Sequence, residues 1–95
     1  MVIVGQDRIT RFARTHAGAR KVLQRFLNIA GRAEWPHYPA VKGTFPATDY
    51  APETGTLNFD IGGNRYRLIA YVDFTEQIMV IHSVMTHEEY NRESF

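Results

Sequence analysis

Two side chains that can move a proton lie close together near the carboxyl end of the chain. His87 and Tyr90 are three residues apart, a spacing that places both on one face of a helix. Histidine exchanges a proton near neutral pH, and tyrosine acts most readily as a proton donor. A simpler interpretation leaves His87 exposed in the first helical turn and packs Tyr90 against Met85. Acid–base chemistry at this pair therefore needs support from other residues.

Two arginines stand at the start of a predicted strand. Because side chains alternate along a strand, Arg65, Arg67 and Ile69 share one face. Arg67 thus falls on a face that is otherwise apolar, where a guanidinium needs a partner. Two kinds of partner fit: a carboxylate such as Asp60 or Asp73, and the phosphate of a ligand. Buried charges are usually paired within the protein, which favours the carboxylate.

Several familiar catalytic and cofactor signatures are missing from the sequence. It has no GxxxxGK[ST] phosphate loop, no HExxH metal motif and no cysteine. Gly62-Gly63 leads into a strand rather than a helix, so it does not open a dinucleotide-binding fingerprint. We therefore expect neither a metal site nor a cofactor. Lys42 is most simply a solvated lysine in a loop.

Apolar periodicity predicts two helices in the first third of the chain. Residues 9–16 and 22–30 repeat apolar side chains at helical spacing. Asp7 is the expected cap at the start of the first helix, and Gly31 is the expected end of the second. Residues 35–55 contain all 4 prolines of the chain and predict a long ordered loop, a kind of segment that is often functional.

The second half of the chain predicts strands. Residues 57–61, 66–74 and 78–84 carry strand patterns, and residues 62–64 (Gly-Gly-Asn) have the composition of a hairpin turn. The strand at 66–74 is apolar on both faces, which indicates a central position in its sheet. These segments predict a three-strand antiparallel meander, with Val2–Val4 as a candidate additional strand.

The carboxyl end predicts a short helix. Thr86 and Glu89 form a capping box, which puts His87 at the first helical position and Tyr90 at the fourth. Together the elements predict an α+β fold, in which two N-terminal helices pack on a small antiparallel sheet and a short helix follows. Helices on one face of an antiparallel sheet are a common layered solution to burying a core.

The composition is that of an ordinary globular domain. The chain has 95 residues, of which 44% are hydrophobic and 22% charged, so we expect one domain spanning residues 1–95. No apolar run approaches the roughly 20 residues that span a bilayer, and the first residues lack the features of a signal peptide. Because the absence of cysteine fits a reducing compartment, we expect a cytoplasmic protein without a membrane partner.

Positive charge is concentrated in the first half of the sequence. Residues 1–42 carry 8 cationic and 2 acidic side chains, and residues 43–95 carry 3 and 8, so the net charges are +6 and −5. Lys21 and Arg25 belong to the basic half. A basic surface of this kind binds a polyanion or simply solvates the outer faces of helices.

Five segments taken together resemble a known family. They are residues 16–19 (HAGA), 34–36 (EWP), 41–49 (VKGTFPATD), 59–70 (FDIGGNRYRLIA) and 84–90 (VMTHEEY). In this order they resemble the HigB family of bacterial type II toxins, which has a RelE-like fold. The resemblance covers nearly the whole chain, and GGNRYRLIA and THEEY are its most specific parts.

The resemblance implies a ribosome-dependent mRNA interferase, an endoribonuclease that cuts mRNA on the ribosome. It also implies a cognate antitoxin, a HigA-like helix-turn-helix protein that neutralises the toxin and represses their operon. Operator DNA would then be bound only through the antitoxin. The basic helical half would lie along ribosomal RNA or dock the antitoxin.

The implied reaction is a metal-independent attack of the RNA 2′-hydroxyl on the adjacent phosphorus. Such a reaction needs a base, an acid and a cation for the crowded phosphate charge. The resemblance assigns Arg67 to charge stabilisation, His87 and Tyr90 to acid–base roles, and Lys42 to the phosphate. The residues it places against RNA are Lys21, Arg25, Asn64 and Arg65, of which Asn64 alternatively shapes the turn.

Two positions depart from the family pattern. Asp60 stands where the family usually has asparagine, and His82-Ser83 stand where a basic residue is common. An added carboxylate either weakens phosphate binding or pairs with Arg65 or Arg67. A competing interpretation is therefore a catalytically inactive module with this fold that binds its antitoxin or an RNA. Another is a toxin of this fold that poisons DNA gyrase.

Overall fold

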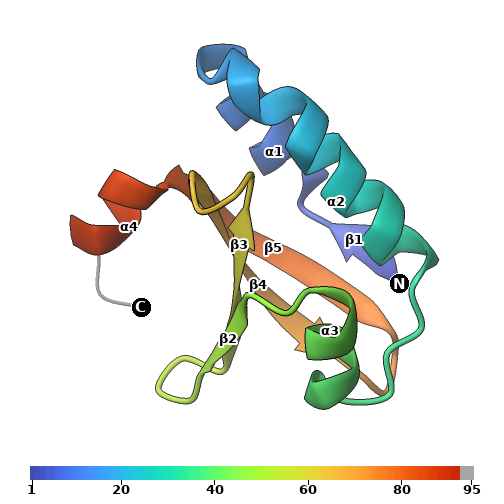
Figure 1. The fold of residues 1–95 in the computed structure, drawn as a ribbon. Helices are drawn as coiled ribbons and strands as arrows, with labels where there is room; N and C mark the ends of the chain where they lie inside the picture. Colours follow the sequence, from blue (N-terminus) through green and yellow to red (C-terminus); the bar gives the residue numbers. More distant parts are fainter. Residues whose placement is uncertain (93–95) are drawn as a thin grey trace.

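A computed structural model describes residues 1–92 and has the predicted α+β architecture (Figure 1). The helices are α1 (Gln6–Thr15), a short 3₁₀ helix η1 (Ala17–Ala19), α2 (Arg20–Arg32), α3 (Tyr38–Thr44) and α4 (His87–Arg92). The strands are β1 (Val2–Val4), β2 (Thr48–Ala51), β3 (Thr56–Ile61), β4 (Tyr66–Asp73) and β5 (Ile78–Thr86). No helix in residues 1–92 is long and apolar enough to cross a membrane.

The strands form one mixed sheet in the order β1-β5-β4-β3-β2. The predicted meander of β3, β4 and β5 is confirmed, and β4 is its central strand. The candidate strand at Val2–Val4 is confirmed as β1, but it pairs with β5 in parallel, so the sheet is mixed rather than antiparallel as expected. The turn from β3 to β4 has the positive φ angles that its composition predicts, 67°, 63° and 81° at Gly62, Gly63 and Asn64.

Two predicted helix boundaries are wrong. The N-cap of α1 is Gly5, in the left-handed conformation, and Asp7 lies in the first turn, where its side chain pairs with Arg11. The second helix, α2, continues through Gly31 to Arg32. A glycine within the last turn is tolerated because packing of the apolar face outweighs its weak helix propensity.

The predicted loop at residues 35–55 contains two regular elements, α3 and β2. Proline at the first turn of α3 replaces an N–H that has no helical partner, and the His37 side chain accepts a hydrogen bond from Ala40 N. Trp35 Nε1 donates to Thr44 Oγ1 over 3.0 Å and joins the start of this segment to the end of α3. Lys42 is therefore an exposed helical residue rather than a loop lysine.

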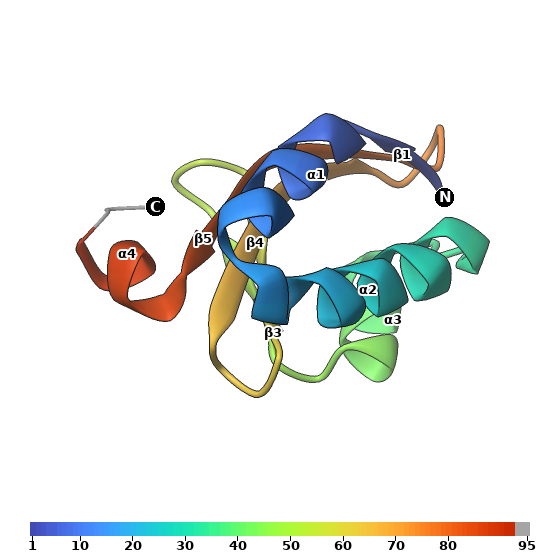
Figure 2. The ribbon, with the colours of Figure 1, turned by 90° about the horizontal axis from the view of Figure 1, so that it is seen from above.

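The core lies between the sheet and the first helices. Leu23 and Phe26 of α2 are buried against strand residues such as Phe59 and Leu68, and the Phe26 and Phe59 rings are 4.9 Å apart. Figures 1 and 2 show α1, α2 and α3 on one side of the sheet and α4 on the other. Residues of β3 and β4 that point away from the core therefore face the α4 side.

Gly5 provides a test of how the segment after β1 packs against β5. A Cβ atom at this position would lie 2.9 Å from the Ile81 carbonyl oxygen, and φ is +92°. We expect Gly5→Ala to lower the free energy of unfolding by about 1–3 kcal/mol. Gly43→Ala is the matched control, since a Cβ there meets nothing within 4 Å. It should leave stability unchanged or raise it by up to about 1 kcal/mol in urea unfolding. Equal effects of the two changes would contradict the packing of β1 on β5.

Candidate functional site

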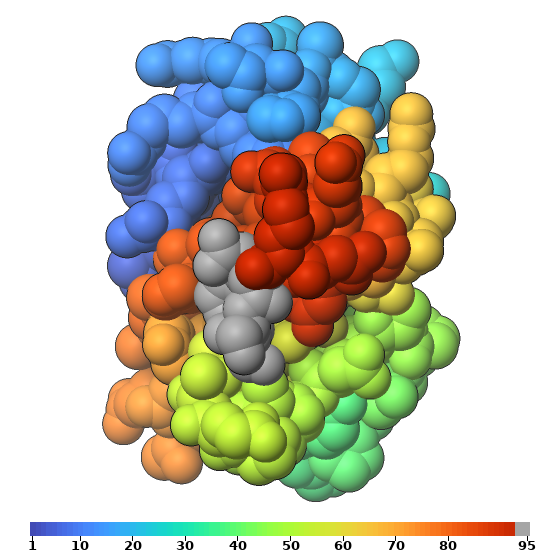
Figure 3. Space-filling view, turned by 90° about the vertical axis from the view of Figure 1, so that its left-hand side faces the viewer, coloured from blue at the N-terminus to red at the C-terminus, as the bar shows by residue number. Residues whose placement is uncertain are grey.

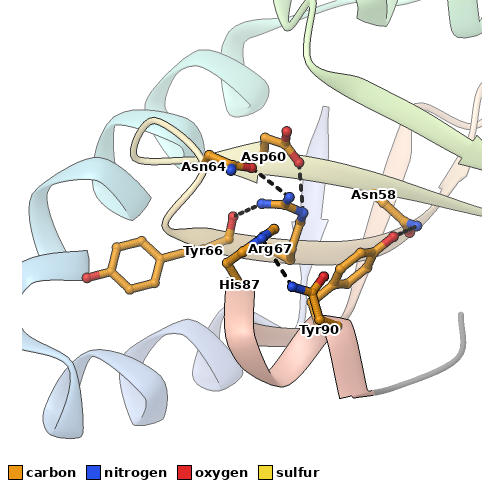
Figure 4. Close-up of polar contacts among 8 residues, drawn as sticks. Asn58, Asp60, Asn64, Tyr66, Arg67, His87 and Tyr90 are labelled. Atoms are coloured by element: carbon orange, nitrogen blue, oxygen red, sulfur yellow. Dashed lines mark hydrogen bonds and ion pairs between the residues drawn. The ribbon is translucent and has the colours of Figure 1, made fainter.

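The register of β3 and β4 places a carboxylate directly opposite the candidate arginine. Asp60 pairs with Arg67 across the two strands, and Asp60 Oδ1 lies 2.9 Å from Arg67 Nε (Figure 4). The Arg67 side chain is 9% exposed and that of Asp60 is 27% exposed. Of the partners considered for Arg67, Asp60 is the carboxylate that the structure supplies. The guanidinium keeps its charge in the sheet because this carboxylate compensates it.

The turn and the first residue of β4 each supply a further contact to the same guanidinium. Arg67 Nη2 donates to Asn64 Oδ1 over 2.7 Å, and Nη1 donates to the Tyr66 carbonyl over 3.3 Å. Asn64 reaches this position from a left-handed turn conformation that asparagine tolerates better than most residues. Three contacts from two strands and a turn thus fix the orientation of the guanidinium.

The capping box predicted at the start of α4 is confirmed. Thr86 N donates to Glu89 Oε1 over 3.0 Å, and Glu89 N donates to Thr86 Oγ1 over 3.1 Å. Hydrogen bonding of the Glu89 carboxyl, first to the Thr86 backbone N–H and then to the Thr86 side chain, lowers its pKa below the ordinary value of 4.5. His87 N also donates to the Arg65 carbonyl over 2.9 Å, which ties the start of α4 to the start of β4.

Tyr90 lies against the arginine from the α4 side of the sheet. The Arg67 Cζ atom is 5.1 Å from the centre of the Tyr90 ring, within the range of a cation–π contact. The Tyr90 hydroxyl accepts a hydrogen bond of 3.1 Å from Asn58 Nδ2 (Figure 4). Asn58 is buried and was not among the predicted site residues. The sequence held a signal for it, because Asn58 and Asp60 are polar residues on the same face of an otherwise apolar strand.

His87 is partly buried rather than exposed, so the simpler interpretation of this residue is wrong. Its Nε2 atom lies 3.2 Å from Asn91 Nδ2. Its Nδ1 atom is buried and has no hydrogen-bond partner among the described residues. Buried polar atoms are rarely left unsatisfied, and the exceptions are frequently functional.

The structure brings some of the predicted residues together and separates others. Arg67, His87, Tyr90 and Asn64 lie where the β3–β4 turn meets α4, two segments that Figure 3 shows side by side in yellow and red. Arg65 is exposed, with its guanidinium 6.0 Å from the centre of the Tyr66 ring.

The other predicted cations come from the opposite side of the sheet. Lys21 and Arg25 are exposed on α2, and Arg25 lines a pocket that Asp60 also lines. Lys42 is exposed on α3, and within residues 1–92 it makes no hydrogen bond or ion pair with Arg67, His87 or Tyr90. Residues 1–92 contain no group of three or more His, Cys, Asp or Glu side chains placed to hold a metal ion.

This arrangement combines a fixed cation with two groups that can exchange protons. The guanidinium is positioned before any ligand arrives, which is the condition under which a charge stabilises a developing anion most strongly. His87 and Tyr90 approach it from a separate element, α4. The site therefore has the parts needed to bind a phosphate and move protons around it.

Comparison with known families identifies the class of protein that has this fold. Residues 19–93 match the model of the HigB toxin family, described as the RelE-like toxic component of a toxin–antitoxin system. The chain belongs to this family, so the protein is the toxic component of a toxin–antitoxin system and has an antitoxin as its partner. A search among curated proteins found no match.

The capping box provides a test of how α4 is positioned. We expect Thr86→Ala to lower the free energy of unfolding by about 0.5–2 kcal/mol, because the first turn of α4 loses its cap.

The pKa of Glu89 is lowered in the folded protein, so its ionised carboxylate stabilises the fold at pH values above the unfolded pKa of 4.5. The stability gap between the natural protein and Glu89→Gln should therefore narrow as pH falls below 4.5.

Urea unfolding at a series of pH values measures this gap. Glu88→Gln is the control, because it removes a charge from the same helical turn without touching the capping hydrogen bonds. A gap for Glu89→Gln that widens toward low pH would contradict the capping role of this residue.

Proposed function

We propose that this toxin is an endoribonuclease that cuts mRNA on the ribosome, in the cytoplasm and without a metal ion. The observation that supports this most directly is the Arg67 guanidinium, positioned by Asp60, Asn64 and Tyr66 beside two proton-exchanging side chains. An RNA 2′-hydroxyl attacks the adjacent phosphorus, the bond to the 5′-oxygen breaks, and negative charge accumulates on the phosphate oxygens in between.

In this proposal Arg67 stabilises that accumulating charge. A guanidinium has five N–H donors. Contacts with Asp60, Asn64 and Tyr66 engage one donor on each of its three nitrogens, which leaves N–H groups on Nη1 and Nη2 for phosphate oxygens. Two N–H groups at the end of a planar fork match the geometry of a phosphate.

His87 and Tyr90 supply the base and the acid in this proposal. The unsatisfied Nδ1 atom of His87 supports its part, and Asn58 supports the part of Tyr90 by fixing the position of the hydroxyl. Lys21, Arg25, Lys42 and Arg65 are exposed cations that we assign to the RNA backbone outside the cleavage site. We also propose that the antitoxin is HigA-like and that operator DNA is bound only through it.

A second candidate function follows from the pairing of Asp60 with Arg67. The carboxylate compensates the charge that a phosphate would otherwise meet, which favours a toxin that acts by binding a partner without cleaving RNA. Primer extension on a translated mRNA separates the two candidates. New 5′ ends on a translated mRNA, and none on an untranslatable copy of it, are the expected result in a cell-free translation reaction. No new ends with folded, antitoxin-free protein would leave the binding function.

Replacing Arg67 tests its proposed role. We expect Arg67→Gln to reduce the cleavage rate by about 10²–10³-fold, the usual effect of losing one preorganised stabilising donor. Arg32→Gln is the matched control, since Arg32 is exposed at the end of α2 and should retain full activity. Thermal unfolding of both variants reports whether the fold persists. A folded Arg67→Gln protein that cleaves at the natural rate would contradict the proposal, and an unfolded one would make Arg67 a structural residue.

A further inference from the structure

A row of exposed apolar side chains crosses three strands of the sheet. Val4 of β1 and Tyr71 of β4 are both paired with Val80 of β5, so these three side chains lie next to one another on one face. Val2 is two residues from Val4 on β1 and shares that face. The four residues, which we call the apolar patch, are between 40% and 64% exposed. A contiguous apolar patch on a protein surface usually marks an interaction site.

The apolar patch lies on the α4 side of the sheet. Tyr71 is four residues beyond Arg67 on β4, so both side chains point to the same face and are roughly 13 Å apart along the strand. Ile3, between the two valines of β1, packs against the core instead. Helix α4 lies over the Arg67 end of this face, and no helix within residues 1–92 covers the patch (Figure 1). This end of the sheet therefore lacks the second layer that sheets normally pack against.

Two carboxylates lie at the end of the patch. Asp73 points to the same face as Tyr71 and pairs with Ile78, which in turn pairs with Val2. Glu76 follows in the β4–β5 turn, where its backbone N–H donates to Asp73 Oδ1 over 3.0 Å. Both side chains are exposed, and neither forms an ion pair with a residue in the range 1–92.

The charges around the patch indicate the chemistry of its occupant. Residues 68–91, which include most of β4 and all of β5, contain no lysine or arginine. Negative charge without nearby cations disfavours RNA and an anionic membrane surface. A protein segment that combines apolar side chains with a cation is complementary to the patch.

We propose that the apolar patch binds an amphipathic helix of the antitoxin, with a basic side chain of that helix at Asp73 and Glu76. Family membership establishes that the protein has an antitoxin as its partner. The patch is three strands wide, and two strand spacings of about 4.8 Å match the roughly 10 Å diameter of a helix. A strand added at the edge of β1 would instead leave Tyr71 uncovered.

A second copy of this chain fits the patch less well. Four partly exposed side chains bury far less than the roughly 800 Å² per partner of a stable complex. An isologous contact places the same patch on both sides, so neither copy supplies a cation from residues 68–91 to the carboxylates of the other. The antitoxin can add contacts elsewhere on the toxin, and the patch is then one part of a larger interface.

This placement separates the antitoxin from the basic helices. Lys21 and Arg25 are exposed on α2, which lies on the other side of the sheet (Figure 2). They stay exposed when a helix occupies the patch. Of the two roles open to the basic half of the chain, contact with RNA is therefore the one that remains.

Binding of the antitoxin encoded in the same operon tests the patch without requiring cleavage. Val80→Lys places a charge at the centre of the patch and should weaken binding about tenfold in isothermal titration calorimetry, as disturbing a central interface residue does. Tyr50→Lys is the matched control, because Tyr50 is 52% exposed on β2, at the opposite edge of the sheet. It should retain the natural affinity. Unchanged affinity for Val80→Lys, or equal losses for both variants, would overturn the proposal.

Reversing the charge beside the patch tests the chemistry of the partner. Glu76→Lys alters an exposed turn residue whose side chain makes no hydrogen bond within residues 1–92, so it remains informative even where Val80→Lys fails to fold. It should slow association with the antitoxin, and more strongly at low salt. Glu53→Lys, in the turn between β2 and β3, should not. Unchanged or faster association of Glu76→Lys would overturn the assignment of a basic partner segment.

Sedimentation of the antitoxin-free toxin tests the competing occupant. We expect Val80→Lys to sediment as the natural protein does. A natural dimer that Val80→Lys converts into monomers, with unchanged affinity for the antitoxin, would overturn the proposal and assign the patch to a second copy. Because these measurements contain no mRNA, their outcome is independent of whether the toxin proves to be a nuclease.

Discussion

A guanidinium within a β-sheet constrains everything around it, because a charge removed from water needs partners that compensate it. Arg67 meets this requirement through the strand opposite it and through the turn that joins the two strands. Asp60 is opposite Arg67 in one register of β3 and β4, and a shift of one residue would turn Asp60 to the other face. The Gly62-Gly63-Asn64 turn fixes that register, and Asn64 adds its own side chain to the contact.

The second part of the site is added from a different element, α4. This helix is too short to be stable alone, so its position depends on the capping box and on the hydrogen bond from His87 N to Arg65. Once it is in place, the Tyr90 ring covers the Arg67 guanidinium and its hydroxyl meets Asn58. The stability of α4 and the geometry of the site are therefore linked. The capping hydrogen bonds act at a distance, because they join Thr86 to Glu89 and do not involve Arg67.

Local features of this fold were predictable from the sequence, and long-range pairings were not. The turn at residues 62–64, the central strand β4 and the capping box depend on residues close together in the chain. For Arg67 the sequence left two kinds of partner open, a carboxylate such as Asp60 or Asp73 and a ligand phosphate, and the register of β3 and β4 supplies Asp60. By contrast, the parallel pairing of β1 with β5 joins residues from opposite ends of the chain, so no local pattern predicts it. Helix α3 was missed because its proline was interpreted as a sign of a loop, although proline is also common in the first turn of a helix. The contact between Asn58 and Tyr90 spans 32 residues, and no local pattern specifies it.

The most direct test of this account is a structure of the toxin on a ribosome with an mRNA whose reactive 2′-hydroxyl is methylated, so that the chain stays uncut. We expect the scissile phosphate to lie on the Nη atoms of Arg67, with the Asp60 contact to Nε retained and with His87 and Tyr90 facing the two oxygens that exchange protons. A phosphate bound elsewhere, with Arg67 still enclosed by Asp60, Asn64 and Tyr90, would contradict the account and make this cluster a structural feature of the sheet.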